Sequence, residues 1–157
     1  MRPGLLLTTL FLLFASLAGP AVALPAPMSD AELMEKSNLV ALVRVLSVTC
    51  TGVAKDELTG ENLPNYSAKL KLLEVKKGSE KKGDVVAITF HAIPKGMLGP
   101  WAVFYYPGEE VWTHLSGSGG TYQTIWWNAR GETLHKAVIT KLPTKQGETV
   151  AIPEASK

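Results

Sequence analysis

Hydrophobic residues in the middle of the chain recur mostly at every second position, which is the spacing of half-buried strands. Runs of this kind are separated by clusters of Gly, Pro, Asn and Ser, which are typical of turns. The pattern predicts strands over 38–49, 66–77, 84–91, 110–115 and 121–127, with a sixth over 132–142. The chain is therefore expected to be mainly β.

One short helix is expected ahead of the first strand. Ser29 is followed three residues later by Glu32, the spacing of a capping box in which each side chain binds the other's backbone N–H. The helix is expected to end near Ser37 and to turn Leu33 and Met34 toward the core.

The second predicted strand contains a change of phase. Alternate apolar positions end at Leu72, and Val75 then takes the phase of Leu73 instead. A shift by one residue is typical of a β-bulge.

One helix followed by five or six strands predicts a small closed β-barrel of the OB type. A two-sheet sandwich is the alternative. The expected domain covers 24–143, and the polar segment 144–157 is expected to be a C-terminal tail.

The first 23 residues have the three-part layout of a secretory signal peptide. A positive start at Arg2 precedes an apolar run over 5–17, and Ala21-Val22-Ala23 supplies small residues before a cut after Ala23. The run is shorter than the ~20 residues that span a membrane, so an uncleaved anchor is the less favoured alternative. The protein is expected in the bacterial periplasm or secreted, without stable membrane insertion.

Charge and cysteine content further limit which kinds of exported protein this chain can be. The chain has 16 basic and 14 acidic residues, and loss of Arg2 with the signal leaves 15 − 14 = +1. So small a net charge gives no reason to expect nucleic acid as a partner. Cys50 is the single cysteine, which excludes an intramolecular disulfide and favours a bacterial over a eukaryotic secreted domain. Cys50 ends an apolar strand, which predicts a buried structural thiol.

Several short motifs resemble one family. The chain resembles exported bacterial domains with the tissue-inhibitor-of-metalloproteinases/netrin-like OB barrel, over most of residues 29–135. The resemblance is carried by the order of four segments, Ser37–Val40, Arg44-Val45, Glu74–Gly78 and Tyr106–Val111.

This resemblance implies a fold and a compartment. Val43 stands where the family usually has glycine, and no cysteine lies near Leu24. The zinc-chelating mechanism of the animal inhibitors, which uses an N-terminal cysteine, is therefore not carried over, and fold alone does not fix function.

Catalytic and metal motifs are weak. His114, Ser116 and Ser118 lack the further partners of a catalytic triad, and Glu109 and Glu110 are adjacent, so in a strand they point to opposite faces. We expect no enzymatic activity and no cofactor.

Histidines supply the metal or small-ligand alternative. The histidines lie on separate segments, and His91 with His114 is the one pairing that neighbouring barrel strands would bring together. The alternative hypothesis is a periplasmic protein that binds a small ligand or metal through His91 and His114.

Aromatic residues supply the leading hypothesis. Trp112, Tyr122, Trp126 and Trp127 fall within 16 residues, and two adjacent tryptophans in a strand face opposite ways. An outward Trp anchors a protein partner or a sugar ring, or is covered by the N-terminal helix or by the 92–100 loop. We expect an exported, non-enzymatic binding or accessory module that contacts a protein partner through this aromatic surface.

Cleavage after Ala23 predicts a mature chain that begins at Leu24. N-terminal sequencing of the protein recovered from an envelope fraction checks this. A chain that retains Met1 would contradict it.

Overall fold

The computed structural model describes residues 25–96 and 102–153. The predicted signal peptide, 1–23, lies outside the described residues. Within the described residues, a short helix precedes seven strands. They are α2 (Asp30–Lys36), β1 (Leu39–Lys55), β2 (Asn62–Lys77), β3 (Val85–His91), β4 (Glu110–Ser118), β5 (Thr121–Thr124), β6 (Arg130–His135) and β7 (Thr149–Ala151).

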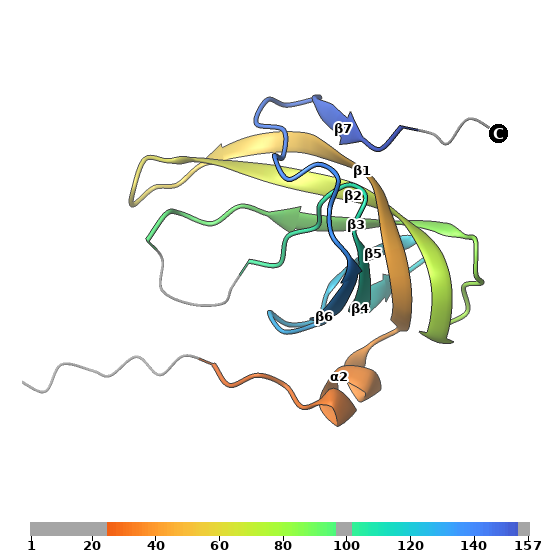
Figure 1. Ribbon diagram of the computed structural model, residues 1–157. Helices are drawn as coiled ribbons and strands as arrows, with labels where there is room; N and C mark the ends of the chain where they lie inside the picture. The colour runs from red at the N-terminus through yellow and green to blue at the C-terminus, as the bar shows by residue number, and fades with distance from the viewer. Residues whose placement is uncertain (1–24, 97–101, 154–157) are drawn as a thin grey trace, which may run out of the picture.

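Five of these strands close a barrel (Figure 1). The hydrogen-bonded order is β1-β2-β3-β5-β4, and β4 pairs back onto β1. All the pairs are antiparallel except β3 with β5, which is parallel. The prediction of a small OB-like barrel is confirmed, and the sandwich is not formed. β6 extends the sheet beyond β4, and β7 lies beside β1.

Alternate residues of the barrel strands fill its interior. Val86, Ile88 and Phe90 of β3 are buried, as their alternation predicts. Cys50 is fully buried and unbonded to another cysteine, which confirms the prediction of a buried thiol.

The predicted bulge in the second strand is present. Leu42 pairs with Glu74 and Val43 pairs with Leu72, so Leu73 is left without a partner. Another register shift, between Val45 and Ser47, lies on β1. Such bulges bend and twist a strand pair, which allows these two long strands to curve around the barrel.

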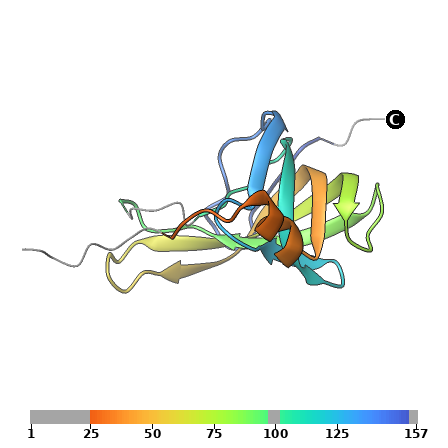
Figure 2. The ribbon, with the colours of Figure 1, turned by 90° about the horizontal axis from the view of Figure 1, so that it is seen from below.

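Helix α2 forms at the predicted place and lies across one end of the barrel (Figure 2). The capping box is complete: the Ser29 N–H donates to Glu32 at 2.8 Å, and the Glu32 N–H donates to the Ser29 hydroxyl at 3.3 Å. Leu33 is buried, but Met34 is 38 % exposed, so the prediction that both face the core is wrong for Met34. Successive residues point about 100° apart on a helix, and α2, with seven residues, buries only Leu33.

The strands extend further than the apolar pattern indicates. The predicted loop over 51–65 contains the end of β1 and the start of β2, which pair as far as Lys55 with Asn62. These ends project from the barrel as a hairpin (Figure 1). Most of their side chains are exposed, so alternation of apolar and polar residues does not mark them.

The C-terminal part differs from the prediction in two places. The strand expected over 132–142 is β6, which begins at Arg130 and ends at His135. The segment expected to be a tail contributes β7, whose residues pair with Ser47, Val48 and Thr49 of β1. A three-residue strand carries too little alternation to be read from sequence.

The glycine-rich segment 116–120 is a tight hairpin. Ser118 pairs with Thr121, and the two residues between them, Gly119 and Gly120, have φ angles of +63° and +82°. Positive φ at both central positions is the geometry of a type I′ turn, whose twist matches that of the strands.

Gly117→Ala is expected to destabilise the protein strongly. Gly117 has a φ of +142°, and a Cβ there would lie 2.3 Å from the carbonyl oxygen of Thr121. We expect a loss of about 2 kcal/mol or more in the free energy of unfolding, measured by urea denaturation.

Gly119→Ala is the matched control. Its φ is also positive, but a Cβ there meets nothing within 4 Å. We expect a loss of about 1 kcal/mol from the backbone conformation alone. Equal losses in the two variants would show that the contact with Thr121 is unimportant.

Candidate functional site

A cavity lies where the parallel strands β3 and β5 separate. They pair through Ala87 with Thr121 and Ile88 with Tyr122, and no further pair is formed. β3 then continues beside β2 as far as His91, while β5 continues beside β4. The separation leaves a cavity of about 560 Å³, a size typical of ligand sites.

The cavity is lined by aromatic, hydroxyl, amide and small apolar side chains from six parts of the fold: β1, β2, β3, the segment 102–103, β5 and the turn after β5. The lining residues are Thr51, Asn65, Tyr66, Thr89, Phe90, His91, Ala102, Val103, Gln123, Thr124, Trp126 and Trp127. None of these is Asp, Glu, Lys or Arg. The lining therefore suits an uncharged group that has both apolar surface and hydrogen-bonding atoms.

Stacked rings form the inner wall of the cavity. The rings of Tyr66 and Phe90 are 5.1 Å apart and nearly parallel, and Phe90 also lies 5.8 Å from the ring of Tyr105. Tyr105 is fully buried, and its hydroxyl is 2.5 Å from that of Thr113. Burial raises the pKa of the Tyr66 and Tyr105 hydroxyls, so both rings are uncharged at neutral pH.

Trp126 and Trp127 lie in a turn instead of a strand. β5 ends at Thr124, and the turn is closed by the Ala129 N–H, which donates to the Trp126 carbonyl at 3.1 Å. The prediction of a strand through Trp127 is therefore wrong. Gly131, which follows this turn, lies inside β6 without a positive φ.

The N-terminal segment before α2 holds this turn in place. The Trp126 indole N–H donates to the Ala26 carbonyl at 3.0 Å. The Asn128 side chain both accepts from the Met28 N–H, at 3.2 Å, and donates to the Met28 carbonyl, at 2.8 Å. Trp126 and Trp127 are each half-buried, so part of each indole is exposed and part is covered.

The other two predicted aromatic residues lie away from the cavity. Trp112 on β4 makes a cation–π contact with Lys76, whose Nζ lies 3.8 Å from the ring centre. Tyr122 is 3 % exposed, and its hydroxyl donates to Glu80. Burial, with the bond to Glu80, raises the pKa of Tyr122 to about 12. The four aromatic residues therefore do not form one surface. Of the four, Trp126 and Trp127 line the cavity.

The two candidate histidines are separated. His91 lies on β3 at the cavity, but His114 lies on β4, where its Nδ1 is 3.3 Å from the Ala129 carbonyl oxygen. β5 lies between β3 and β4, so the expectation that these histidines are neighbours across a strand pair is wrong. Within 25–96 and 102–153, no group of three or more His, Cys, Asp or Glu side chains could hold a metal ion.

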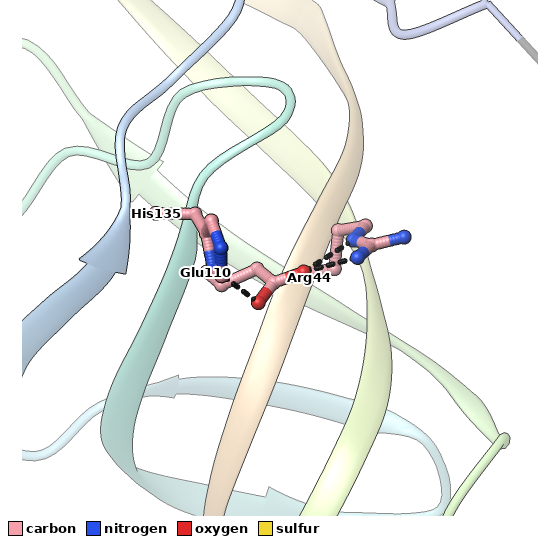
Figure 3. A network of polar contacts seen from close by, with 3 residues as sticks. All are labelled: Arg44, Glu110 and His135. Carbon is pink, nitrogen blue, oxygen red and sulfur yellow. Dashed lines mark hydrogen bonds and ion pairs between the residues drawn. The ribbon is translucent and has the colours of Figure 1, made fainter.

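A separate polar network binds β6 to the barrel (Figure 3). Glu110 is 8 % exposed and lies between Arg44 and His135, which approach it from opposite sides. The Arg44 Nε donates to its Oε1 at 2.7 Å, and the His135 Nδ1 lies 2.7 Å from its Oε2. The neighbouring Glu109 is also buried and pairs instead with Arg130, at 2.6 Å.

The pKa values of these adjacent carboxyl groups shift in opposite directions. Burial raises the pKa of Glu109, and its bonds to the Tyr106 N–H and Arg130 only partly oppose this. Burial also acts to raise the pKa of Glu110, but Arg44 and His135 together lower it below its ordinary value. The two groups therefore have separate partners: Arg130 for Glu109, and Arg44 with His135 for Glu110.

Sequence reasoning identified Trp126, Trp127 and His91 but not the rest of the lining. Tyr66 and Phe90 follow the alternation of core residues, and their sequence context does not distinguish a core ring from a cavity wall. Asn65, Gln123 and Thr124 are ordinary exposed strand residues until the fold brings them together.

Comparisons of the chain with family models, with curated proteins and with solved structures gave no significant match. Among the residues that the structure describes, no helix is both long enough and apolar enough to cross a bilayer.

The lowered pKa of Glu110 predicts an acid-dependent loss of stability. A carboxyl whose pKa is lower in the folded state contributes stability above its unfolded pKa, near 4.5, and loses it as the pH falls through the folded pKa. Glu110→Gln is expected to cost up to about 1 kcal/mol at neutral pH, because Arg44 is half-exposed. Below about pH 5, the unfolding free energy of Glu110→Gln should then fall less steeply with decreasing pH than that of the wild type.

Urea denaturation over this pH range measures the effect. Glu132→Gln, which changes an exposed carboxyl on β6, is the control and should keep the wild-type pH profile. If Glu110→Gln loses as much unfolding free energy at acid pH as the wild type does, Glu110 is not the source of this pH dependence.

Proposed function

We propose that this protein is an exported, non-enzymatic binding module whose cavity at the end of the barrel binds a segment of a partner protein. One observation carries the proposal. Trp126 and Trp127, predicted to contact a partner, line a cavity together with Tyr66 and Phe90, and its lining contains no Asp, Glu, Lys or Arg.

The chemistry of the lining supports a protein partner. Tryptophan and tyrosine side chains dominate the binding energy of protein interfaces, since each buries a large rigid surface and keeps one polar atom. Asn65, Gln123 and Thr124 add neutral donors and acceptors around these rings. Such an arrangement favours a partial insertion of an uncharged side chain over binding to a charged surface.

The same lining supports binding over catalysis. Two lining side chains, His91 and Tyr66, are ionisable, and burial raises the pKa of the Tyr66 hydroxyl above its ordinary value. General acid–base catalysis favours groups whose pKa is close to the working pH, and the shift of Tyr66 is away from it. Export rests on the sequence of residues 1–23, and membership of the tissue-inhibitor-of-metalloproteinases/netrin-like family stays a prediction.

A small ligand is the second candidate. His91 lines the same cavity, whose volume of about 560 Å³ lies within the range of small-molecule sites. His114 lies on another part of the barrel, so this candidate function now relies on His91 with the amide and hydroxyl groups, without a paired histidine.

Cross-linking in the intact envelope tests the proposal. The full chain with its signal and a C-terminal tag would be compared with Trp127→Ala and with Trp112→Ala, after circular dichroism shows that both variants fold. We expect a discrete cross-linked partner with wild type and with Trp112→Ala, and at least a roughly tenfold weaker product with Trp127→Ala, since anchor residues contribute about 2 kcal/mol or more.

Equal capture by all the variants, or capture by none, would contradict a partner at this cavity. A small molecule that co-purifies with wild type and is lost in His91→Ala, detected by native mass spectrometry, would favour the second candidate instead.

A further inference from the structure

The cavity follows the edge of β3. Its lining includes three consecutive residues, Thr89, Phe90 and His91. Successive side chains of a strand point to opposite faces, so a cavity over one face would touch only alternate residues. Contact with all three places the cavity beside the backbone of the strand.

Two hydrogen bonds show which backbone groups face it. The Ala92 N–H donates to Pro64 of β2 at 2.9 Å, whereas the Ala87 N–H donates to Gly120, on the β5 side, at 2.8 Å. Backbone groups alternate between the two edges of a strand, so Thr89 and His91 point to the same edge as Ala87. The last β3–β5 pair is Ile88 with Tyr122, and His91 lies beyond it.

On the basis of the proposed function, we infer that the partner binds by strand addition: an extended, uncharged peptide segment pairs with the backbone of β3 at His91. Main-chain hydrogen bonds supply affinity in this mode, and pockets for alternate side chains supply specificity. Trp126 and Trp127 provide such a pocket on one side of the added strand.

The observations favour a peptide over a neutral saccharide. Aromatic rings with amide and hydroxyl groups suit either ligand, but a strand edge offers donors and acceptors at the spacing of another peptide backbone. The lining carries no Asp, Glu, Lys or Arg side chain, which complements an uncharged segment.

The His91 backbone can be tested separately from its side chain. His91→Pro removes the N–H from the edge facing the cavity and leaves the bonds of β3 to β2 intact, which is the position where strands accept proline. His91→Ala removes the imidazole and keeps the N–H. Thermal unfolding of both variants checks that the barrel is retained.

The probe is a random pool of acetylated, amidated hexapeptides built from uncharged amino acids, selected by affinity on the wild-type protein. We expect the selected peptide to bind His91→Pro at least about tenfold more weakly than it binds His91→Ala, the effect of one well-formed hydrogen bond. Methylation of the peptide's backbone nitrogens should weaken binding at alternate positions only.

Three results would overturn strand addition: no selected peptide, equal losses in the two His91 variants, or methylation effects without alternation. An oligosaccharide of N-acetylglucosamine that shifts the His91 and Trp127 NMR signals, where no peptide does, would assign the cavity to a saccharide. Envelope capture that still depends on Trp127 would then show that the proposed function holds although this binding mode fails. If neither peptide binding nor Trp127-dependent capture is found, both strand addition and the proposed function are rejected.

Discussion

The barrel depends on the double use of one edge of β1. A strand has two edges, yet β1 pairs with β2, β4 and β7. One edge pairs with β2 throughout, and the other is shared: residues 39–44 pair with β4 and residues 47–49 pair with β7. Between them, Val45 bonds to Gly108 and Glu109, and the Leu46 carbonyl accepts from the Ile152 N–H. The register shift between Val45 and Ser47 lies where the partner changes, so a local distortion allows one strand both to close the barrel and to anchor the C-terminal segment.

The start of β4 fixes β6 through two neighbouring carboxyl groups. Glu109 binds Arg130 at the start of β6, and Glu110 contacts His135 at its end. Backbone pairing between β4 and β6 is interrupted by two register shifts, so these side-chain contacts supply much of the specificity of the docking. Burial makes each carboxyl dependent on its own cation, because a buried charge without a partner is costly.

Local signals predict the parts of the fold that depend on neighbouring residues. The capping box at Ser29, the phase change at Leu73 and the alternation of β3 were all readable, since each follows from spacing along the chain. The features that depend on distant residues were not. The turn at Trp126 and Trp127 is fixed by Ala26 and Met28, about 100 positions earlier, and β7 is fixed by its contact with Thr49.

The candidate site shows the same limit. Sequence alone identified Trp126, Trp127 and His91. It grouped the two tryptophans with Trp112 and Tyr122 because the four are close along the chain, and it paired His91 with His114 because their strands were expected to be neighbours. The cavity itself results from the early end of the β3–β5 pairing, after Ile88 and Tyr122, and no single residue marks that end.

The shared edge of β1 also sets the order in which the barrel can assemble. The partners on this edge, β4 and β7, lie 66 to 104 residues further along the chain, so the pairing that closes the barrel is non-local. Such contacts form slowly, because a large loop must close before they form. The β1–β2 hairpin can form early and β4 can then cover residues 39–44, but residues 47–49 of this edge stay open until residue 151 has emerged. During that interval the nascent chain has an unpaired strand edge, which is prone to aggregation. β7 therefore protects the edge of β1, but only late in synthesis.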